Sequence, residues 1–140
     1  MAVDVGVALS AGDQSAVAAV MNRVVAAWEK HDHVAFSEVF TDNGTMILPG
    51  VFKKGRGEIS SFMQDAFAGA YRGTRVTGEP IHVRFFAPDW GVVITSGGVL
   101  APGETKPSPE RAVHASWVVV KRDGRWLLAA YQNSPAEPRR

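Results

Sequence analysis

Only a few side chains in this sequence could serve as an acid or a base in a reaction. His31, Asp42 and Asp65 are the candidates for a general base, because an imidazole or a carboxylate can accept a proton from a substrate within hydrogen-bond reach. Asp42 also falls in a turn-like segment, where a structural role would explain it. Each candidate needs access to a cavity before its pKa matters, so the catalytic residue stays open at this point.

The histidines do not form a metal-binding pattern. His31 and His33 are two residues apart at a helix junction, which does not place them on one helix face, and no carboxylate joins them at a ligand spacing. The absence of cysteine excludes thiolate ligands, disulfides and cysteine nucleophiles. Segment 55–58, Gly-Arg-Gly-Glu, lacks the Gly-Lys-Ser/Thr part of a phosphate-binding loop. We therefore expect neither a metal nor a cofactor.

Large apolar and aromatic side chains are abundant enough to line a binding pocket as well as a core. Such a lining suits a flat or conjugated hydrophobic ligand. The candidates for the lining are Trp28, Phe36, Phe40, Met46, Phe62, Tyr71, Phe85 and Trp117. Ser96 and Gln132 could orient the ligand, and Asn133 is an alternative if a β-bulge turns it inward.

The helices that must position these residues can be predicted from local patterns. Ser10 indicates a helix start, and apolar residues at three- and four-residue steps continue this helix to about His31. Asp32 is typical of the cap of a second, short helix. Residues 41–44, Thr-Asp-Asn-Gly, are typical of a turn, and segment 55–59 leads into a third helix.

The rest of the sequence predicts strands. We expect them at 45–48, 51–54, 79–86, 91–100, 112–121 and 126–133. The proline-rich segment 101–110 is predicted to be a mobile loop. Asp123 and Gly124 are a strong signal for a two-residue hairpin turn. Helices gathered on one side of a largely antiparallel sheet define an α+β domain.

The turn at Asp123 and Gly124 also sets the expected register of the last hairpin. Regular alternation from this turn pairs Ala115 with Gln132 and places both on the face under the helices. The opposite face combines apolar and polar residues, which is typical of a second packing surface. We therefore expect a homodimer through the outer sheet face, with His82, Arg84, Thr95, His114, Ser116 and Tyr131 at the interface.

Length, charge and hydropathy limit the other functions. The 140 residues allow one domain, which we place at 13–135, between a flexible N-terminal arm (1–12) and a C-terminal tail (136–140). A formal net charge of +1 gives no indication of nucleic-acid binding. The sequence has no run of about 18 apolar residues that could cross a membrane, and its N-terminus lacks the basic region of a signal peptide. These patterns favour a cytoplasmic protein with no nucleic-acid or membrane partner.

Four segments within residues 13–135 carry a resemblance to known proteins: AWEKHDHVAFSEVFTDNGTMILPG, KKGRGEI, FFAPDWGVV and KRDGRWLLAAYQNSP. Together they resemble the SnoaL-like branch of the nuclear-transport-factor-2-like (NTF2-like) superfamily. The WLLAAYQNSP ending is most similar to the SgcJ/EcaC-type proteins of enediyne antibiotic biosynthesis. The resemblance implies a cone-shaped fold, in which a curved mixed or antiparallel sheet wraps around three helices and leaves a pocket between them. It also implies dimerisation through the outer sheet face.

The superfamily includes ketosteroid isomerases, polyketide cyclases, dehydratases and epoxide hydrolases as well as non-catalytic binding proteins, so fold alone does not define function. The resemblance implies that a ketosteroid isomerase would carry a carboxylate base at the position of Leu48 and a tyrosine near Val24. It would also carry a carboxyl group near Ser116 and Trp117, and all three groups are absent. Ketosteroid isomerisation is therefore not expected.

Three functions stay open at this point. The resemblance implies a protein that holds a hydrophobic polyene or polyketide intermediate of enediyne biosynthesis in its pocket and folds, cyclises or protects it. The second reading is an acid–base enzyme, such as a cyclase, isomerase or dehydratase. The third is a non-catalytic partner of a polyketide synthase. A carboxylate or imidazole inside the cone near Gln132 would favour the second reading, and a filled interior would favour the third.

Overall fold

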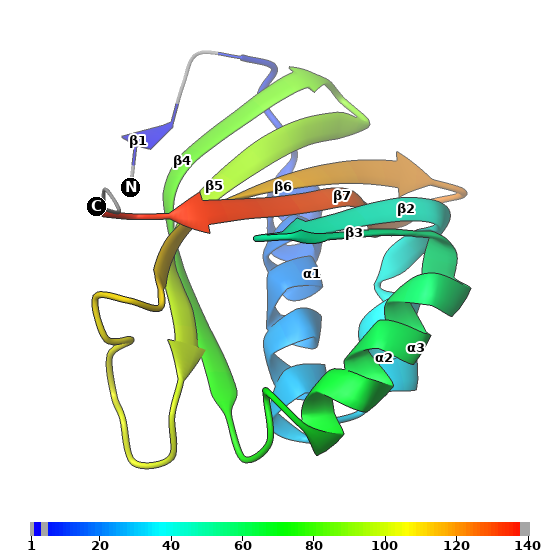
Figure 1. Cartoon of the computed structure of the whole chain (residues 1–140). Coiled ribbons are helices and arrows are strands. Elements are labelled where there is room, and N and C mark those ends of the chain that lie inside the picture. Colours follow the sequence, from blue (N-terminus) through cyan, green and yellow to red (C-terminus); the bar gives the residue numbers. More distant parts are fainter. Residues whose placement is uncertain (1, 4–5, 138–140) are drawn as a thin grey trace.

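The computed structural model describes residues 2–3 and 6–137, which form a curved sheet and three helices on its concave side (Figure 1). The strands are β1 (Ala2–Val3), β2 (Phe40–Leu48), β3 (Val51–Lys54), β4 (Arg75–Ala87), β5 (Trp90–Leu100), β6 (Ala112–Arg122) and β7 (Arg125–Pro135). The helices are α1 (Ala11–Glu29), α2 (His33–Glu38) and α3 (Gly55–Ala68). The predicted α+β class and the cone-shaped wrapping of the sheet around three helices are confirmed.

The sheet is mixed because two of its strand pairs are parallel. The strand order is β1-β4-β5-β6-β7-β2-β3, and β1 pairs with β4 and β2 with β7 in the parallel sense. The four long strands β4 to β7 form the predicted antiparallel meander. Strand β2 precedes the meander in sequence but joins its far side beside β7, which brings the β2–β3 pair next to α3 (Figure 1).

Local sequence explains where the first two helices begin. The Ser10 hydroxyl oxygen accepts a hydrogen bond from the Asp13 backbone N–H at 3.1 Å and caps α1, as predicted. The Asp32 carboxylate accepts from the Ala35 N–H at 3.0 Å and caps α2 in the same way. Between the two helices, His31 has a left-handed backbone conformation with φ of 53°, which lets the chain reverse direction.

The start of α1 is also bonded to the last hairpin. Asp13 Oδ1 accepts a hydrogen bond from the Trp126 indole N–H at 3.0 Å and lies 3.1 Å from Lys121 Nζ. The Trp126 bond and then the Lys121 bond lower the pKa of Asp13 below its ordinary value. The carboxylate therefore joins the first turn of α1 to β6 and β7 and fixes the helix across the concave face.

The N-terminal segment runs along the outermost long strand. Strand β1 pairs with β4 around Val83, and the Val7 N–H donates a hydrogen bond to the Phe85 carbonyl oxygen at 2.9 Å. Helix α1 begins at Ala11, within the predicted arm 1–12. Residues 1, 4–5 and 138–140 lie outside the described residues, and the predicted flexibility of the arm and the tail stays a prediction.

Two predicted boundaries were wrong. Residues 41–44, predicted as a turn, lie inside β2, where the pairing with β7 shifts between Phe40 and Thr45. Pairing with β7 on both sides of this segment keeps the backbone extended, so the turn-forming residues produce a bulge rather than a loop. Strand β4 begins at Arg75 rather than at residue 79, because its pairing with β5 continues as far as Leu100.

Two glycines allow the long β4–β5 pair to bend around the helices. A Cβ atom on Gly97 would lie 2.0 Å from the Thr77 carbonyl oxygen, and one on Gly98 would lie 2.3 Å from the Arg111 carbonyl oxygen. Only glycine permits such a close approach of neighbouring backbones. The last hairpin forms at the predicted turn, where Asp123 and Gly124 have the two positive φ angles of a type I′ turn.

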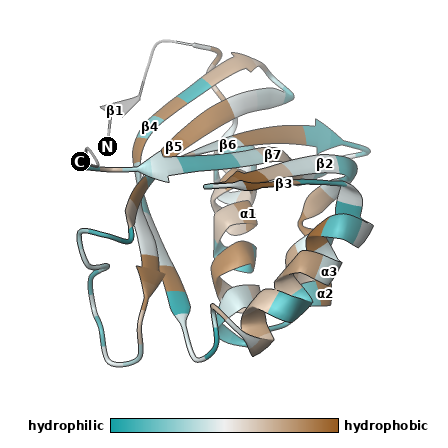
Figure 2. Ribbon diagram, viewed as in Figure 1, coloured by the Kyte–Doolittle hydropathy of each residue, from teal (hydrophilic) through white to brown (hydrophobic). Residues whose placement is uncertain are grey.

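The hydrophobic core lies between the concave face and the helices. Figure 2 shows hydrophobic residues along α1 and along the strands of the curved sheet. The largest fully buried side chains are Phe40, Met46, Ile59, Met63, Leu128, Val20, Val93 and Val119. These side chains come from helices α1 and α3 and from strands β2, β5, β6 and β7. One hydrophobic core therefore joins the helices to the sheet.

Candidate functional site

A partly open cavity of about 90 Å³ lies between α1 and the concave face of the sheet. Residues of α1, α2, β2 and the four long strands form its wall, so the cone does not close completely. Most of the wall is apolar or aromatic. The side chains that bring polar atoms to it are Tyr71, Thr77, Thr95, Arg111, Tyr131 and Asn133.

Tyr131 and Asn133 form a polar pair at one part of the wall. Both residues lie on β7, two positions apart, and therefore on the same face of the sheet. The Asn133 Nδ2 group donates a hydrogen bond to the Tyr131 hydroxyl oxygen at 3.1 Å. The Asn133 Oδ1 atom is buried and has no hydrogen-bond partner. Because buried acceptors are normally paired, this oxygen marks a place where a ligand could supply the missing donor.

The two tyrosines of the wall act as hydrogen-bond donors rather than bases. Burial raises the pKa of Tyr131, a change that the bond from Asn133 partly offsets and the nearby Tyr71 reinforces. Burial also raises the pKa of Tyr71. Both hydroxyls are therefore protonated at neutral pH. The Tyr131 oxygen accepts the bond from Asn133, which leaves its own hydrogen free to donate to a ligand.

Two buried indoles are held by threonine hydroxyls. Trp117 Nε1 donates to Thr95 Oγ1 at 2.9 Å, and Trp28 Nε1 donates to Thr74 Oγ1 at 3.0 Å. The Trp117 ring also packs edge-to-face on Tyr131, with ring centroids 5.0 Å apart. Because both indole N–H groups are satisfied within the protein, the rings offer a ligand apolar surface and a fixed shape.

Arg111 is the only charged residue among the described residues of the wall. Its Nη2 atom lies 2.6 Å from Glu104 Oε1, which also accepts a hydrogen bond from the Ala101 N–H at 2.8 Å. The bond from Ala101 and then the contact with Arg111 lower the pKa of Glu104. These contacts tie segment 101–110 to the start of β6 and neutralise the guanidinium, so the cavity favours an uncharged ligand.

Most of the predicted lining residues come together at this cavity: Trp28, Phe36, Phe40, Met46, Tyr71, Trp117 and Asn133. Four others do not line it. Phe85 is buried further along β4, and Phe62 lies on α3, where it contacts the core from outside the cavity. Ser96 and Gln132 lie on the outer side of the sheet.

The prediction that Gln132 points under the helices was wrong because a β-bulge shifts the register of the last hairpin. The pairing of β6 with β7 shifts just beyond Val119, and Ala129 is left as an extra residue on β7. Beyond the bulge every β7 side chain changes face. Tyr131 and Asn133 therefore turn inward and Gln132 is exposed, which corresponds to the alternative in which a bulge turns Asn133 inward.

The assignment of Thr95 and Tyr131 to the outer face was also wrong. The pairing of β4 with β5 shifts near their turn, so that Val83 lies opposite Val93. The inward-facing residues of β5 therefore include Thr95, which is 3% exposed. The other predicted interface residues, His82, Arg84, His114 and Ser116, do lie on the outer face. The dimer itself stays a prediction.

Two of the three predicted general bases lie on or near the helices. His31 Nε2 lies 2.9 Å from the Thr74 carbonyl oxygen, and its ring stacks on Phe67 with centroids 5.0 Å apart. Asp65 is exposed on α3. Neither residue lines the cavity, so neither can reach a ligand held there.

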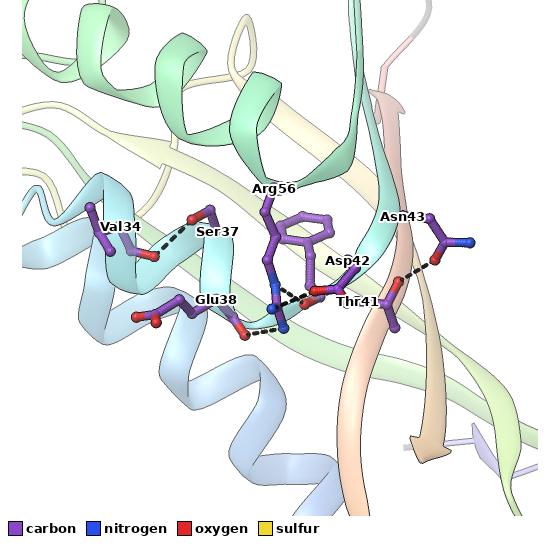
Figure 3. A network of polar contacts seen from close by, with 8 residues as sticks. Val34, Ser37, Glu38, Thr41, Asp42, Asn43 and Arg56 are labelled. Atoms are coloured by element: carbon purple, nitrogen blue, oxygen red, sulfur yellow. Dashed lines mark hydrogen bonds and ion pairs between the residues drawn. The ribbon is translucent and has the colours of Figure 1, made fainter. Parts of the chain in front are cut away.

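Asp42, the third predicted base, belongs to the surface network in Figure 3. Its Oδ1 atom lies 2.7 Å from Arg56 Nη1, and its side chain is 92% exposed. Arg56 also donates from Nε to the Phe40 carbonyl oxygen at 2.9 Å, which joins α3 to β2. Asp42 therefore has a structural partner and does not line the cavity.

The wall offers hydrogen bonds and apolar contact rather than acid–base groups. Its described residues include no aspartate, glutamate or histidine. Within residues 2–3 and 6–137, no three histidine, aspartate or glutamate side chains are grouped so that they could hold a metal ion. No helix in that part of the chain is long and apolar enough to cross a membrane.

Sequence reasoning missed Thr95, Arg111 and Tyr131 as wall residues. One signal could have revealed Tyr131, because the run of five apolar residues at 126–130 interrupts the alternation expected of a regular strand. The sequence contains no comparable signal for Arg111. This residue follows the predicted loop 101–110, and the conformation of that loop places Arg111 at the cavity.

The curved sheet and the three helices are those of an NTF2-like protein with a cystatin-like fold. Residues 17–138 match the SnoaL-like domain family, and the chain belongs to this family. The resemblance to the SnoaL-like branch is thus confirmed, whereas the closer similarity to the SgcJ/EcaC-type proteins stays a prediction. The chain matches no curated protein.

Solved structures with the same fold differ in the activities suggested for them. A domain of unknown function from Nostoc punctiforme is 30% identical, with a TM-score of 0.83 over 92% of this chain and 80% of that chain. A candidate aromatic ring hydroxylase from Novosphingobium aromaticivorans is 19% identical, with a TM-score of 0.76 over 92% of each chain. A candidate dehydratase from Streptomyces avermitilis is 19% identical, with a TM-score of 0.73 over 91% of this chain and 98% of that chain. At these lower identities the likeness supports the fold alone.

Proposed function

We propose that this protein binds a hydrophobic small molecule in the cavity and orients it through Tyr131 and Asn133. The observation that carries the proposal is the unpaired Asn133 Oδ1 atom beside the free Tyr131 hydroxyl donor, in an otherwise apolar wall. The pair offers one acceptor and one donor, which suits a ligand with a carbonyl group and a neighbouring hydroxyl. Few polar groups in an apolar wall are typical of sites that orient a small molecule.

The finer proposal is that the ligand is a polyene or polyketide intermediate of enediyne-type biosynthesis. The aromatic wall, with Trp28, Phe36 and Trp117, supports a conjugated ligand, and the resemblance of the WLLAAYQNSP ending supports the pathway. Holding a reactive chain in one conformation away from water could direct its folding or cyclisation without a base in the wall. Because the interior contains a cavity, it gives no support to the hypothesis that the protein is only a non-catalytic partner of a polyketide synthase.

Tryptophan fluorescence tests ligand binding directly. The uncharged conjugated probe methyl cis-parinarate should quench the wild-type emission, and Trp117→Phe should lose a large part of this quenching because Trp117 lines the cavity. The matched control is Trp90→Phe, because Trp90 is 40% exposed at the turn between β4 and β5. If dialysed wild-type protein shows no saturable quenching, or if Trp90→Phe loses as much as Trp117→Phe, the proposal is wrong.

Removal of the Tyr131 hydroxyl tests how the ligand is oriented. Tyr131→Phe keeps the ring that packs on Trp117 and removes the only atom that can donate from this position. A neutral ketone probe should bind about two- to tenfold more weakly to this variant, which is the range expected for one net hydrogen bond. Unchanged affinity, measured by isothermal titration calorimetry, would exclude Tyr131 as the orienting group.

We also propose a homodimer through the outer sheet face. The supporting observation is a partly buried apolar stripe on this face, formed by Val92, Ile94, Val118 and Leu127, beside the polar residues named above. Val118→Lys should dissociate the dimer, since it places a charge in the stripe without touching the cavity. Sedimentation equilibrium measures the outcome, and a monomeric wild-type protein would contradict the proposal.

A further inference from the structure

A second cavity, of about 370 Å³, lies between the N-terminal segment, α1 and the strands β4 and β5, and it is open to solvent where Ala8, Gln14 and Ala18 are exposed. Val17, Val83, Phe85 and Val93 contribute to a wall that contains no charged residue among those described. Gln14 brings the one side-chain amide to this wall, and its Nε2 group donates to the Leu9 carbonyl oxygen at 3.0 Å. The second cavity therefore suits an apolar group and has no site for a charged one.

The two cavities follow one another along the same elements. On β5, Thr95 lines the first cavity and Val93 the second, and these successive inward positions are about 7 Å apart. On α1, Val24 lines the first cavity and Val17 the second. Met21 lies between them and lines both. The two cavities therefore lie next to each other between α1 and the sheet and share Met21 in their walls.

The first cavity alone is small for a drug-sized ligand. Sites for drug-sized ligands usually have volumes of about 300–1,000 Å³, and the first cavity has only about 90 Å³. The two volumes together fall within that range. Met21 is only partly buried, and its unbranched side chain with three rotatable bonds can move aside more readily than a branched one.

We propose, on the basis of the function proposed above, that the two cavities form one site for an uncharged amphipathic ligand with a straight apolar tail. The hydroxy-ketone head of the ligand lies at Tyr131 and Asn133, with its carbonyl oxygen accepting from Tyr131 and its hydroxyl donating to Asn133 Oδ1, and the tail passes Met21 into the second cavity toward Phe85. Met21 is the residue that decides how long a tail the site accepts. The head is uncharged because Arg111 already pairs with Glu104 at 2.6 Å.

A homologous series of hydroxy-ketones, from 1-hydroxy-2-butanone to 1-hydroxy-2-tridecanone, tests this arrangement by calorimetry. For the wild type, affinity should rise by up to about fourfold for each added methylene and continue to rise after the first cavity is full. Ala18→Phe should obstruct the second cavity at its rim on α1, since Ala18 lines it and is exposed there. Long ketones should then bind at least about tenfold more weakly, and short ones within about twofold of the wild type.

The matched control is Ala19→Phe, because Ala19 is exposed on the same helix and lines neither cavity. Val83→Phe fills the second cavity from the opposite wall and keeps the test decisive if Ala18→Phe does not fold. Met21→Ala should accelerate the association of long ketones and leave that of short ones unchanged, as measured by stopped-flow fluorescence.

The outcomes separate this inference from the function on which it rests. One outcome would contradict the inference alone: short ketones bind in a way that depends on Tyr131, but the increase in affinity per methylene stops at the same chain length in the wild type, Ala18→Phe and Val83→Phe. In that case the two cavities are not one site. If Ala19→Phe shortens the accepted tail as much as Ala18→Phe, the second cavity is likewise not involved. If no ketone binds the wild type, the proposed function itself fails.

Discussion

The unpaired amide oxygen of Asn133 leads to a prediction in which stability and binding change in opposite directions. Asn133→Leu replaces the buried amide with an apolar side chain of similar size and removes the acceptor that has no donor. It also removes the hydrogen bond from Nδ2 to the Tyr131 hydroxyl. We expect the variant to be more stable than the wild type and to bind ligand more weakly, as is common for polar groups kept for function.

The magnitude follows from the two contributions. A buried acceptor without a partner costs about 1–3 kcal/mol, whereas a net hydrogen bond such as that between Asn133 and Tyr131 contributes about 0.5–1.5 kcal/mol. The difference predicts that the free energy of unfolding rises by about 1 kcal/mol. For a chain of 140 residues this corresponds to an increase in Tm of about 3 °C.

Urea denaturation followed by tryptophan fluorescence measures the change, and circular dichroism gives the Tm. Gln132→Leu is the matched control, because Gln132 is the adjacent residue on β7 and is exposed on the outer face. It should change the free energy of unfolding by less than about 0.5 kcal/mol and leave ligand affinity unchanged. A loss of more than about 1 kcal/mol in Asn133→Leu would show that the amide oxygen is satisfied. Impaired binding in Gln132→Leu would refute the register given by the bulge.

Three further predictions concern the framework of the site. Thr74→Val should lower the free energy of unfolding by about 1–3 kcal/mol in urea titrations, because it leaves the buried Trp28 indole N–H without its acceptor. Asp13→Asn should destabilise the protein at pH 7. Donors from the last hairpin lower the pKa of Asp13, so its ionised form contributes stability that is complete above about pH 4 and is lost as the pH falls through the lowered pKa. The difference from the wild type should therefore shrink below pH 4 when both are unfolded in urea at several pH values. Gly97→Ala should cost at least about 2 kcal/mol, because the added Cβ atom would lie 2.0 Å from the Thr77 carbonyl oxygen, and a melting curve within 2 °C of the wild type would contradict this.

The elements that could be predicted from the sequence are those whose boundaries depend on local chemistry. Ser10 and Asp32 cap their helices through residues three positions away, and Asp123 with Gly124 forms a type I′ turn from its own backbone preferences. The apolar wall was also largely predictable, because large side chains on inward-facing stripes must meet inside the cone whatever the details of strand pairing.

The polar part of the site could not be predicted in the same way, because it depends on strand register. The bulge at Ala129 arises from the pairing of β7 with β6, which no window of neighbouring residues specifies. The predicted bases His31, Asp42 and Asp65 failed for a related reason. Their residue types suit acid–base chemistry, but their access to the cavity depends on how distant segments pack.

A single extra residue in β7 thus determines which polar groups the cavity contains. Without the bulge, the inward polar side chains would be those of Gln132 and Ser134, an amide and a small hydroxyl group, with no phenol. With the bulge, the inward groups are a phenol and an amide that are already hydrogen-bonded to each other, two positions apart on a rigid strand. The pair is therefore oriented before a ligand binds, so that less conformational entropy is lost on binding. The aromatic wall sets the shape of the ligand, and the bulge sets the position of its polar head, so the two properties can be altered by separate substitutions.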